Sequence, residues 1–287
     1  MIFVKSEDLK YGMRLAKPIY NKTGVLLYER NTRLTLQGIE SVKNFGLLGL
    51  YILEPAEPVP PMSEEDLDFE RFQTMAVFSI REELDNIIAG REPVNLKRLA
   101  NAIITNYGRL DHKITFTQNL RSTTDYVYKH VINTAILCAL ISAQVYYTPT
   151  EQEELVLAAL LHDIGKLLLP NKVREKYDDY DTNDLIIVKK IQNDGLGLLR
   201  PEIGIDSGVR RIVAQIHRME YGNSNLEQGK ILKSTKILKV ANLFDTMTCM
   251  KISEEAISEI AAIKYLLLNK DEFDEEIVGA LIKSINI

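Results

Sequence analysis

Three histidines and one aspartate are the residues of this sequence best suited by type and position to bind a metal. His162 and Asp163 are adjacent within the leucine-rich stretch "LLHDIGKLLLP", and His130 and His217 lie in other apolar stretches. A charge buried without a partner is costly, and an ion or a counter-charge normally compensates it. Imidazole nitrogen together with carboxylate oxygen suits divalent iron, manganese or zinc. The pattern predicts a metal site, and a hydrogen-bonded His-Asp pair without an ion is the alternative.

The leucine-rich stretch predicts one continuous helix over 150–168. In such a helix His162 and Lys166 would share a face. Asp163 would project about 100° away from His162. The pair can therefore reach one ion only in a groove to which other helices contribute donors, and His130 is the third donor that we expect.

Composition and charge exclude several classes of function. The chain of 287 residues has a formal net charge of −5 and a pI near 5.6, which argues against capture of long nucleic acid or of an anionic membrane.

The beginning of the sequence does not read as a signal peptide, and its apolar stretches are too short or too polar to span a bilayer. Cys138 and Cys249 read as packing residues, and His112 as a surface histidine. We expect a cytoplasmic protein.

The elements that must position these residues form two regions. Residues 1–53 predict a small α+β module, with strands at "MRLAKPIY" and "GVLLYE" joined by the turn "NKTG", a helix between Thr35 and Gly46, and a last strand "LGLYIL". Residues 54–63 are proline-rich and predict a stiff linker. Residues 64–287 predict an all-α domain. Its helices are expected at 64–90, 94–109, 123–147, 150–168, 182–199, 207–220, 228–250, 254–268 and 273–285.

Several of these segments together resemble a known family. His130 followed by "HDIGK", and the later "ILKVANLFDTMT", are similar to the HD superfamily of metal-dependent phosphohydrolases, and "ALLHDIGKLLLPNKV" is similar to its HD-GYP branch. The resemblance covers about 120–250, and residues 1–53 resemble the small domain that often precedes HD-GYP domains. It implies a mainly α fold: an HD-type helical bundle preceded by the α+β module. Usual members of the branch cleave cyclic di-GMP.

The resemblance also shows where this sequence departs from the family. His130, His162, Asp163 and Lys166 match family positions, but the later histidine of the family falls near Asn193. The double histidine becomes Ile216-His217, followed by Arg218 in place of an acidic residue. The "VAD" triplet ends in Asn242, and the acidic position before the first histidine holds Tyr126, with Asp125 beside it. The segment expected to contain Gly-Tyr-Pro reads "MEYGNSN".

These departures predict a degenerate centre. A two-metal site needs several carboxylates, and at the family positions Asp163 alone remains, so we expect one divalent iron, manganese or zinc ion, or none. The resemblance implies as metal ligands His130, His162, Asp163, His217 and Asn242. It implies catalytic roles for Lys166 and Asp163, and ligand contacts for Asn193 and Arg218. Asp245, which could pair with Lys239 or Lys251, is interpreted as structural.

The sequence leaves alternative functions open. The first is a regulatory module with weak or no turnover, which binds a cyclic dinucleotide, another small phosphate, a protein partner or a second copy of itself. The second is an active single-metal phosphohydrolase that acts on a cyclic dinucleotide or another small phosphate ester. The third makes the N-terminal module the working part, with the helical domain serving to dimerise.

Overall fold

The structure is a computed structural model. It describes residues 1–287 except 109–119, 122–124, 177–179, 223–230, 252–256 and 286–287, so the predicted surface position of His112 lies outside the described residues. The chain divides into two compact units, Met1–Ser79 and Ile80–Ile287. The division falls inside helix α2, Glu64–Ile88, rather than at the proline-rich segment 54–63.

The first unit is a small α+β module. Its antiparallel sheet has the order β1-β5-β2, and β3 and β4 form a separate hairpin. The elements are β1 (Ile2–Lys5), β2 (Arg14–Leu15), β3 (Ile19–Tyr20), β4 (Leu26–Tyr28), α1 (Leu36–Asn44) and β5 (Gly49–Leu53), with a 3-10 turn η1 at Ser6–Asp8. The Thr35 side chain accepts a hydrogen bond from the Gly38 amide and caps α1, and Gly46 follows the helix with φ +69°.

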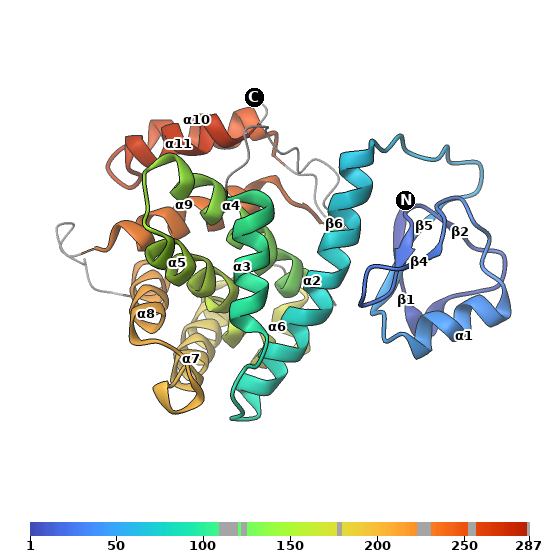
Figure 1. Cartoon of the computed structure of the whole chain (residues 1–287), viewed down its shortest axis with the longest axis horizontal. Coiled ribbons are helices and arrows are strands. Elements are labelled where there is room, and N and C mark those ends of the chain that lie inside the picture. Colours follow the sequence, from blue (N-terminus) through green and yellow to red (C-terminus); the bar gives the residue numbers. More distant parts are fainter. Residues whose placement is uncertain (109–119, 122–124, 177–179, 223–230, 252–256, 286–287) are drawn as a thin grey trace. The chain divides into compact units, whose positions relative to one another are not determined.

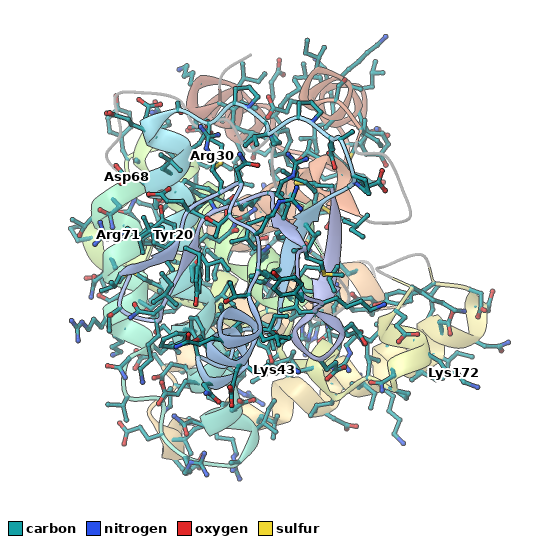
Figure 2. The ribbon with its side chains drawn as sticks, turned by 90° about the vertical axis from the view of Figure 1, so that its right-hand side faces the viewer. Tyr20, Arg30, Lys43, Asp68, Arg71 and Lys172 are labelled. Carbon is teal, nitrogen blue, oxygen red and sulfur yellow. The ribbon has the colours of Figure 1, made fainter. Side chains whose placement is uncertain are left out.

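The first turns of α2 pack on this module, which explains why they belong to the first unit. Lys17 forms an ion pair with Glu70, and Gly24, at φ +78°, lies so close to Arg71 that a Cβ there would come within 2.8 Å of the guanidinium. Figure 2 labels Tyr20 near Arg71, and burial raises the pKa of the Tyr20 hydroxyl. The turn "NKTG" therefore needs glycine for its backbone conformation, which L side chains rarely adopt.

The second unit is mainly helical, and the predicted mainly α fold class is confirmed (Figure 1). After the last turns of α2 come α3 (Leu96–Tyr107), α4 (Tyr126–Gln144), α5 (Pro149–Leu161), η2 (Ile164–Leu168), α6 (Asn171–Arg174), α7 (Thr182–Leu198), η3 (Pro201–Ile203), α8 (Ser207–Tyr221), α9 (Lys233–Thr248), α10 (Glu259–Leu268) and α11 (Glu275–Ser284). A short parallel pair, β6 (Leu120–Arg121) and β7 (Met250–Lys251), accompanies them.

Helix α4 is the core of the second unit. It packs against α3, α5, α9 and α11. Among the described residues it is the one helix long and apolar enough to span a membrane. The sequence alone had indicated that its apolar stretches were too short or too polar for this. However, 89% of the apolar part of the helix is buried inside the protein. Its hydrophobicity is thus that of a core helix, and its polar residues are buried along with the apolar ones.

The predicted continuous helix over 150–168 is wrong. Helix α5 starts with a capping box between Thr148 and Glu151 and ends at Leu161. Asp163, at φ −107° and ψ 16°, leaves the α conformation, and the chain continues as the 3-10 turn η2. His162 and Asp163 therefore lie at a break between two helical segments, where adjacent side chains can converge as they cannot in a regular helix.

Candidate metal centre

Two histidines and one aspartate converge inside the second unit. His130 comes from the first turns of α4, and His162 and Asp163 from the junction of α5 and η2. One nitrogen or oxygen atom of each lies within 4.8 Å of the others, and all three side chains are fully or almost fully buried. Asp163 Oδ2 is 3.4 Å from His130 Nε2 and 3.6 Å from His162 Nε2.

The protonation of His162 follows from its surroundings. Its Nδ1 is 2.8 Å from the carbonyl oxygen of Ala159, and because a carbonyl can only accept, Nδ1 donates its hydrogen there. Burial lowers the pKa of His162 to about 4, so the ring is neutral near pH 7. The lone pair of Nε2 therefore faces the cluster.

A carboxylate orients His130 in the same way. His130 Nδ1 lies 2.6 Å from Asp245 Oδ2, and both groups are buried. A carboxylate oxygen accepts, so Nδ1 carries a hydrogen, and in the neutral form of the ring the lone pair is on Nε2. This is the arrangement by which carboxylates commonly orient metal-binding histidines. Asp245, interpreted from the sequence as structural, thus contacts a candidate ligand.

The two oxygens of Asp163 have different partners. Lys166 Nζ lies 2.8 Å from Oδ2, and Gln192 Nε2 donates to Oδ1 at 2.8 Å. Burial opposes ionisation of Asp163, but the adjacent Lys166 ammonium outweighs that effect and holds the pKa of the carboxyl below its usual range. Asp163 is therefore an anion with one oxygen directed at the histidine nitrogens.

Glycines allow η2 and α7 to approach closely enough for these contacts. A Cβ on Gly165 would come within 2.8 Å of the Ile191 carbonyl oxygen, and a Cβ on Gly195 within 2.7 Å of the Gly165 amide nitrogen. Real side chains do not tolerate such distances. The "HDIG" glycine and a glycine of α7 thus place Gln192 against Asp163.

The donor set fits one divalent cation. The Nε2 atoms of His130 and His162 are buried with no hydrogen-bond partner among the described residues, and they face Asp163 Oδ2. Ligand atoms about 2.0–2.2 Å from one ion lie about 3–3.6 Å apart, which matches these separations. The buried amide oxygen of Gln192 also lacks a partner there and is a neutral donor in the same region. Asp163 is the one carboxylate in the group.

His217 lies beside this cluster but is engaged elsewhere. Its Nε2 donates to the carbonyl oxygen of His162 at 2.6 Å, while Nδ1 is buried with no hydrogen-bond partner among the described residues. Burial lowers its pKa, so the ring is neutral. The structure thus connects α8 to the end of α5 through His217.

The other predicted site residues have different positions. Asn242 is buried on α9, and its Nδ2 donates to Glu220 Oε1 at 2.6 Å. Asn193 and Arg218 are exposed. The amide that reaches Asp163 belongs to Gln192, one residue before Asn193. The sequence predictions missed Gln192 and Asp245. The first could have been identified as the amide next to Asn193, and the second by its position one turn after Asn242.

Comparisons with known proteins identify the family of this chain. A family model described as HD domain matches residues 93–277. The cyclic di-GMP phosphodiesterase response regulator RpfG of Xanthomonas campestris is 26% identical over 152 residues, 51% of this chain and 40% of that protein. The cyclic di-GMP phosphodiesterase PdeB of Borreliella burgdorferi is 24% identical over 172 residues, 57% of this chain and 44% of that protein. The chain spans about two fifths of the length of these curated relatives.

A solved structure shares the fold. Bd1817, described as an HDG"Y"P protein from Bdellovibrio bacteriovorus, aligns with a TM-score of 0.59 over 98% of this chain and 97% of that one, at 16% identity. At this identity the likeness is one of fold. With the family match and the curated relatives, it confirms the HD-GYP-type resemblance recognised in the motifs.

Proposed function

Since this chain belongs to the HD domain family and carries a domain of the HD-GYP type, we propose that it is a regulatory member with a degenerate metal centre. Its centre binds a single divalent cation, and its turnover of phosphodiesters is weak or absent. The role left to the domain is to bind a cyclic dinucleotide or another small phosphate, or a protein partner, in the cytoplasm.

The observation that carries the proposal is the number of carboxylates. Among the described residues, the group able to hold a metal contains Asp163 as its single carboxylate, and Asp245 is already hydrogen-bonded to His130. Two adjacent dications need several anionic ligands to offset their mutual repulsion. Gln192 and Asn242 can contribute neutral oxygens only.

A bound dication would polarise a phosphate oxygen and lower the pKa of a water molecule. His130 and His162 would hold it by Nε2 and Asp163 by Oδ2. Lys166, whose ammonium is almost buried beside Asp163, would stabilise negative charge on a phosphate oxygen. It cannot generate hydroxide, so the chain's own residues supply binding and charge stabilisation rather than a nucleophile.

The alternative is an active single-metal phosphohydrolase. The observation that favours it is the convergence of two imidazole Nε2 atoms on one carboxylate oxygen, as a preorganised cation site would require. The substrate would be a cyclic dinucleotide, as in the names of the curated relatives, or another small phosphate ester.

Metal analysis and a hydrolysis assay distinguish the two. Protein purified without oxygen should hold about one iron, manganese or zinc ion per chain and should release little or no linear dinucleotide from cyclic di-GMP. Asp163→Asn should lose the ion, whereas the matched variant Asp194→Asn, at an exposed position of α7, should keep it. Two ions per chain, or robust hydrolysis that Asp163→Asn abolishes, would reject a degenerate centre.

A further inference from the structure

Helix α10, at the outer edge of the second unit in Figure 1, carries apolar residues on two opposite faces. One face is buried and packs on α9 and α11. Its members are Ala262, Ile263 and Leu266. The outward face holds Ile260, Leu267 and Leu268, which follow i, i+7, i+8 spacing and are 67%, 36% and 73% exposed. Tyr265 borders this face and is 46% exposed. We call these four exposed side chains, with Lys264 among them, the α10 stripe.

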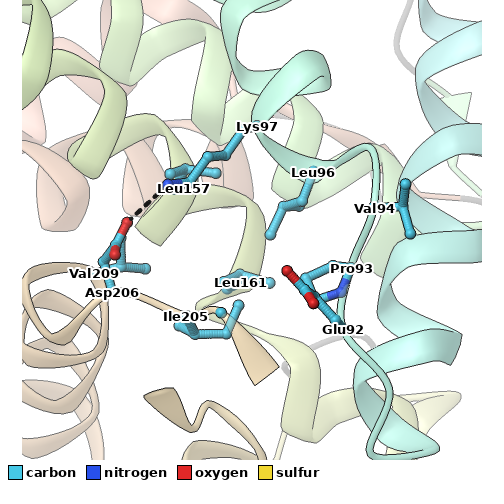
Figure 3. Close-up of a pocket in the computed structure, with 11 residues that line it drawn as sticks. Glu92, Pro93, Val94, Leu96, Lys97, Leu157, Leu161, Ile205, Asp206 and Val209 are labelled. Carbon is cyan, nitrogen blue, oxygen red and sulfur yellow. Dashed lines mark ion pairs between the residues drawn. The ribbon is translucent and has the colours of Figure 1, made fainter. Parts of the chain in front are cut away.

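Such an outward face is unusual for a helix at the surface of a monomeric protein, whose outer side is normally polar. Eleven large apolar side chains in the described part of the second unit are exposed, and five of them lie between Ile257 and Leu268. An exposed group of apolar side chains of this kind marks an interaction surface. The cavity of about 340 Å³ between α3, α5 and α8 offers no such surface, because Leu157, Leu161 and Val209 at its base are buried (Figure 3).

Charges are placed unevenly along the α10 stripe and the turn that follows it. Lys264, in the middle of the stripe, is exposed and forms no ion pair with any residue that the structure describes. The turn between α10 and α11 carries Asp271 and Glu272, both exposed. Glu272 has Lys239 as an ion-pair partner at 3.3 Å, and such surface pairs are weak in water. A positive charge thus lies inside the stripe, and two acidic residues lie beyond its C-terminal end.

We propose that the α10 stripe is the contact surface between two copies of this chain related by a two-fold axis. With the axis beside Leu267 and Leu268, the two helices run antiparallel and the leucines of one copy cover those of the other. Lys264 of each copy then faces the acidic turn of its partner, so the charges are complementary across the contact. One stripe therefore supplies both sides of the interface.

The size of the α10 stripe sets the strength of this dimer. Standard-size interfaces use about 20–30 residues a side, whereas the stripe and the acidic turn supply far fewer. We therefore expect reversible association with a dissociation constant in the micromolar range. None of the candidate metal ligands lies on α10, so the inference stands whatever the centre turns over.

Sedimentation of the full chain over about 1–1,000 µM tests the proposal. The average mass should rise from monomer toward dimer, and a monomer at every concentration would overturn the proposal. Leu268→Gln should weaken the dimer by about tenfold or more, because each copy loses a leucine that the contact buries. The matched control Ile186→Gln, at an isoleucine of α7 that is 66% exposed, should leave association unchanged. A dimer that survives in Leu268→Gln, or is lost equally in the control, would contradict the assignment.

Charge reversals test the antiparallel arrangement separately from any effect on folding. Lys264→Glu, and in a second variant Asp271→Lys with Glu272→Lys, should each weaken self-association about tenfold, because like charges then face each other. An equimolar mixture of the two variants should restore the dimer, since each residue at position 264 again faces an opposite charge. Two misfolded proteins would not rescue each other in this way. A mixture that stays monomeric would rule out the two-fold contact, and every readout is independent of hydrolysis.

Discussion

His217 Nε2 lies 2.6 Å from the main-chain carbonyl oxygen of His162, the residue that directly follows the end of α5. His217, which was predicted to be a metal ligand, thus donates a hydrogen bond to the backbone of His162, another predicted ligand. The contact is between buried groups, and it fixes the distance between α8 and the centre.

We predict that His217→Leu destabilises the protein by about 1–3 kcal/mol, because the buried His162 carbonyl loses its donor. The same variant should still bind one ion, since His130, His162 and Asp163 remain. Urea unfolding of the metal-free protein and metal titration measure the two effects, and His217→Gln, which keeps a donor, should recover part of the stability. Loss of metal binding at unchanged stability would instead make His217 a ligand.

Replacing Asp245 should weaken metal binding without unfolding the domain. Asp245→Asn keeps the shape and an acceptor for His130 Nδ1 but removes the charge that strengthens His130 as a donor. We expect the affinity for Mn²⁺ or Zn²⁺ to fall about 10–100-fold. Competition against a chelating dye measures it, with Asp194→Asn as the control, and equal affinities would leave Asp245 a purely structural partner.

The glycines between η2 and α7 give a matched pair of variants. Gly195→Ala should cost about 1–3 kcal/mol of unfolding free energy, because its Cβ would lie 2.6 Å from the Gly165 Cα. Gly197→Ala, on the same helix with nothing within 4 Å, should be neutral or stabilise by about 0.5–1 kcal/mol. Chemical unfolding compares them, and similar costs for both would show that η2 and α7 are not packed so closely.

Acid should loosen the start of α7 at a pH set by Asp181. The carboxylate of Asp181 accepts hydrogen bonds from the backbone N–H groups of Asp184 and Asn183, and Lys176 lies nearby. These contacts lower the pKa of Asp181 to about 2. A carboxyl group whose pKa is lower in the folded than in the unfolded state stabilises the fold at pH values above its unfolded pKa, near 4. This stabilisation is lost as the pH falls toward 2. Asp181→Asn, which still caps but does not titrate, should flatten the fall of the urea midpoint between pH 4 and 2.5. An unchanged slope would exclude Asp181 as its source.

Much of the helical domain could be predicted because its apolar period is regular. The expected helices at 64–90, 123–147 and 182–199 differ by a few residues from α2, α4 and α7. The end of α5 could not be predicted, because leucines continue through His162 and Asp163 with helical spacing. Directly after the break, Gly165 packs against α7, which is a contact between segments distant in the sequence.

The site shows the same limit. The residue types of His130, His162 and Asp163 were enough to suggest a cluster. The sequence did not show which other residues contact these three side chains. Asp245 could have paired with a neighbouring lysine, and only the fold shows that it faces α4, 115 residues away. Gln192 rather than the adjacent Asn193 faces Asp163. This choice depends on the rotation of α7 about its axis, which the spacing of apolar residues in the sequence fixes only loosely.

Leu161 and His162 are consecutive residues, one lining a cavity between α3 and α8 and the other a candidate nitrogen donor for a metal. The peptide bond that joins them is planar, so only the φ and ψ angles on either side of it separate the cavity wall from the imidazole. A substitution at Leu161 would therefore alter the surroundings of a candidate ligand one residue away.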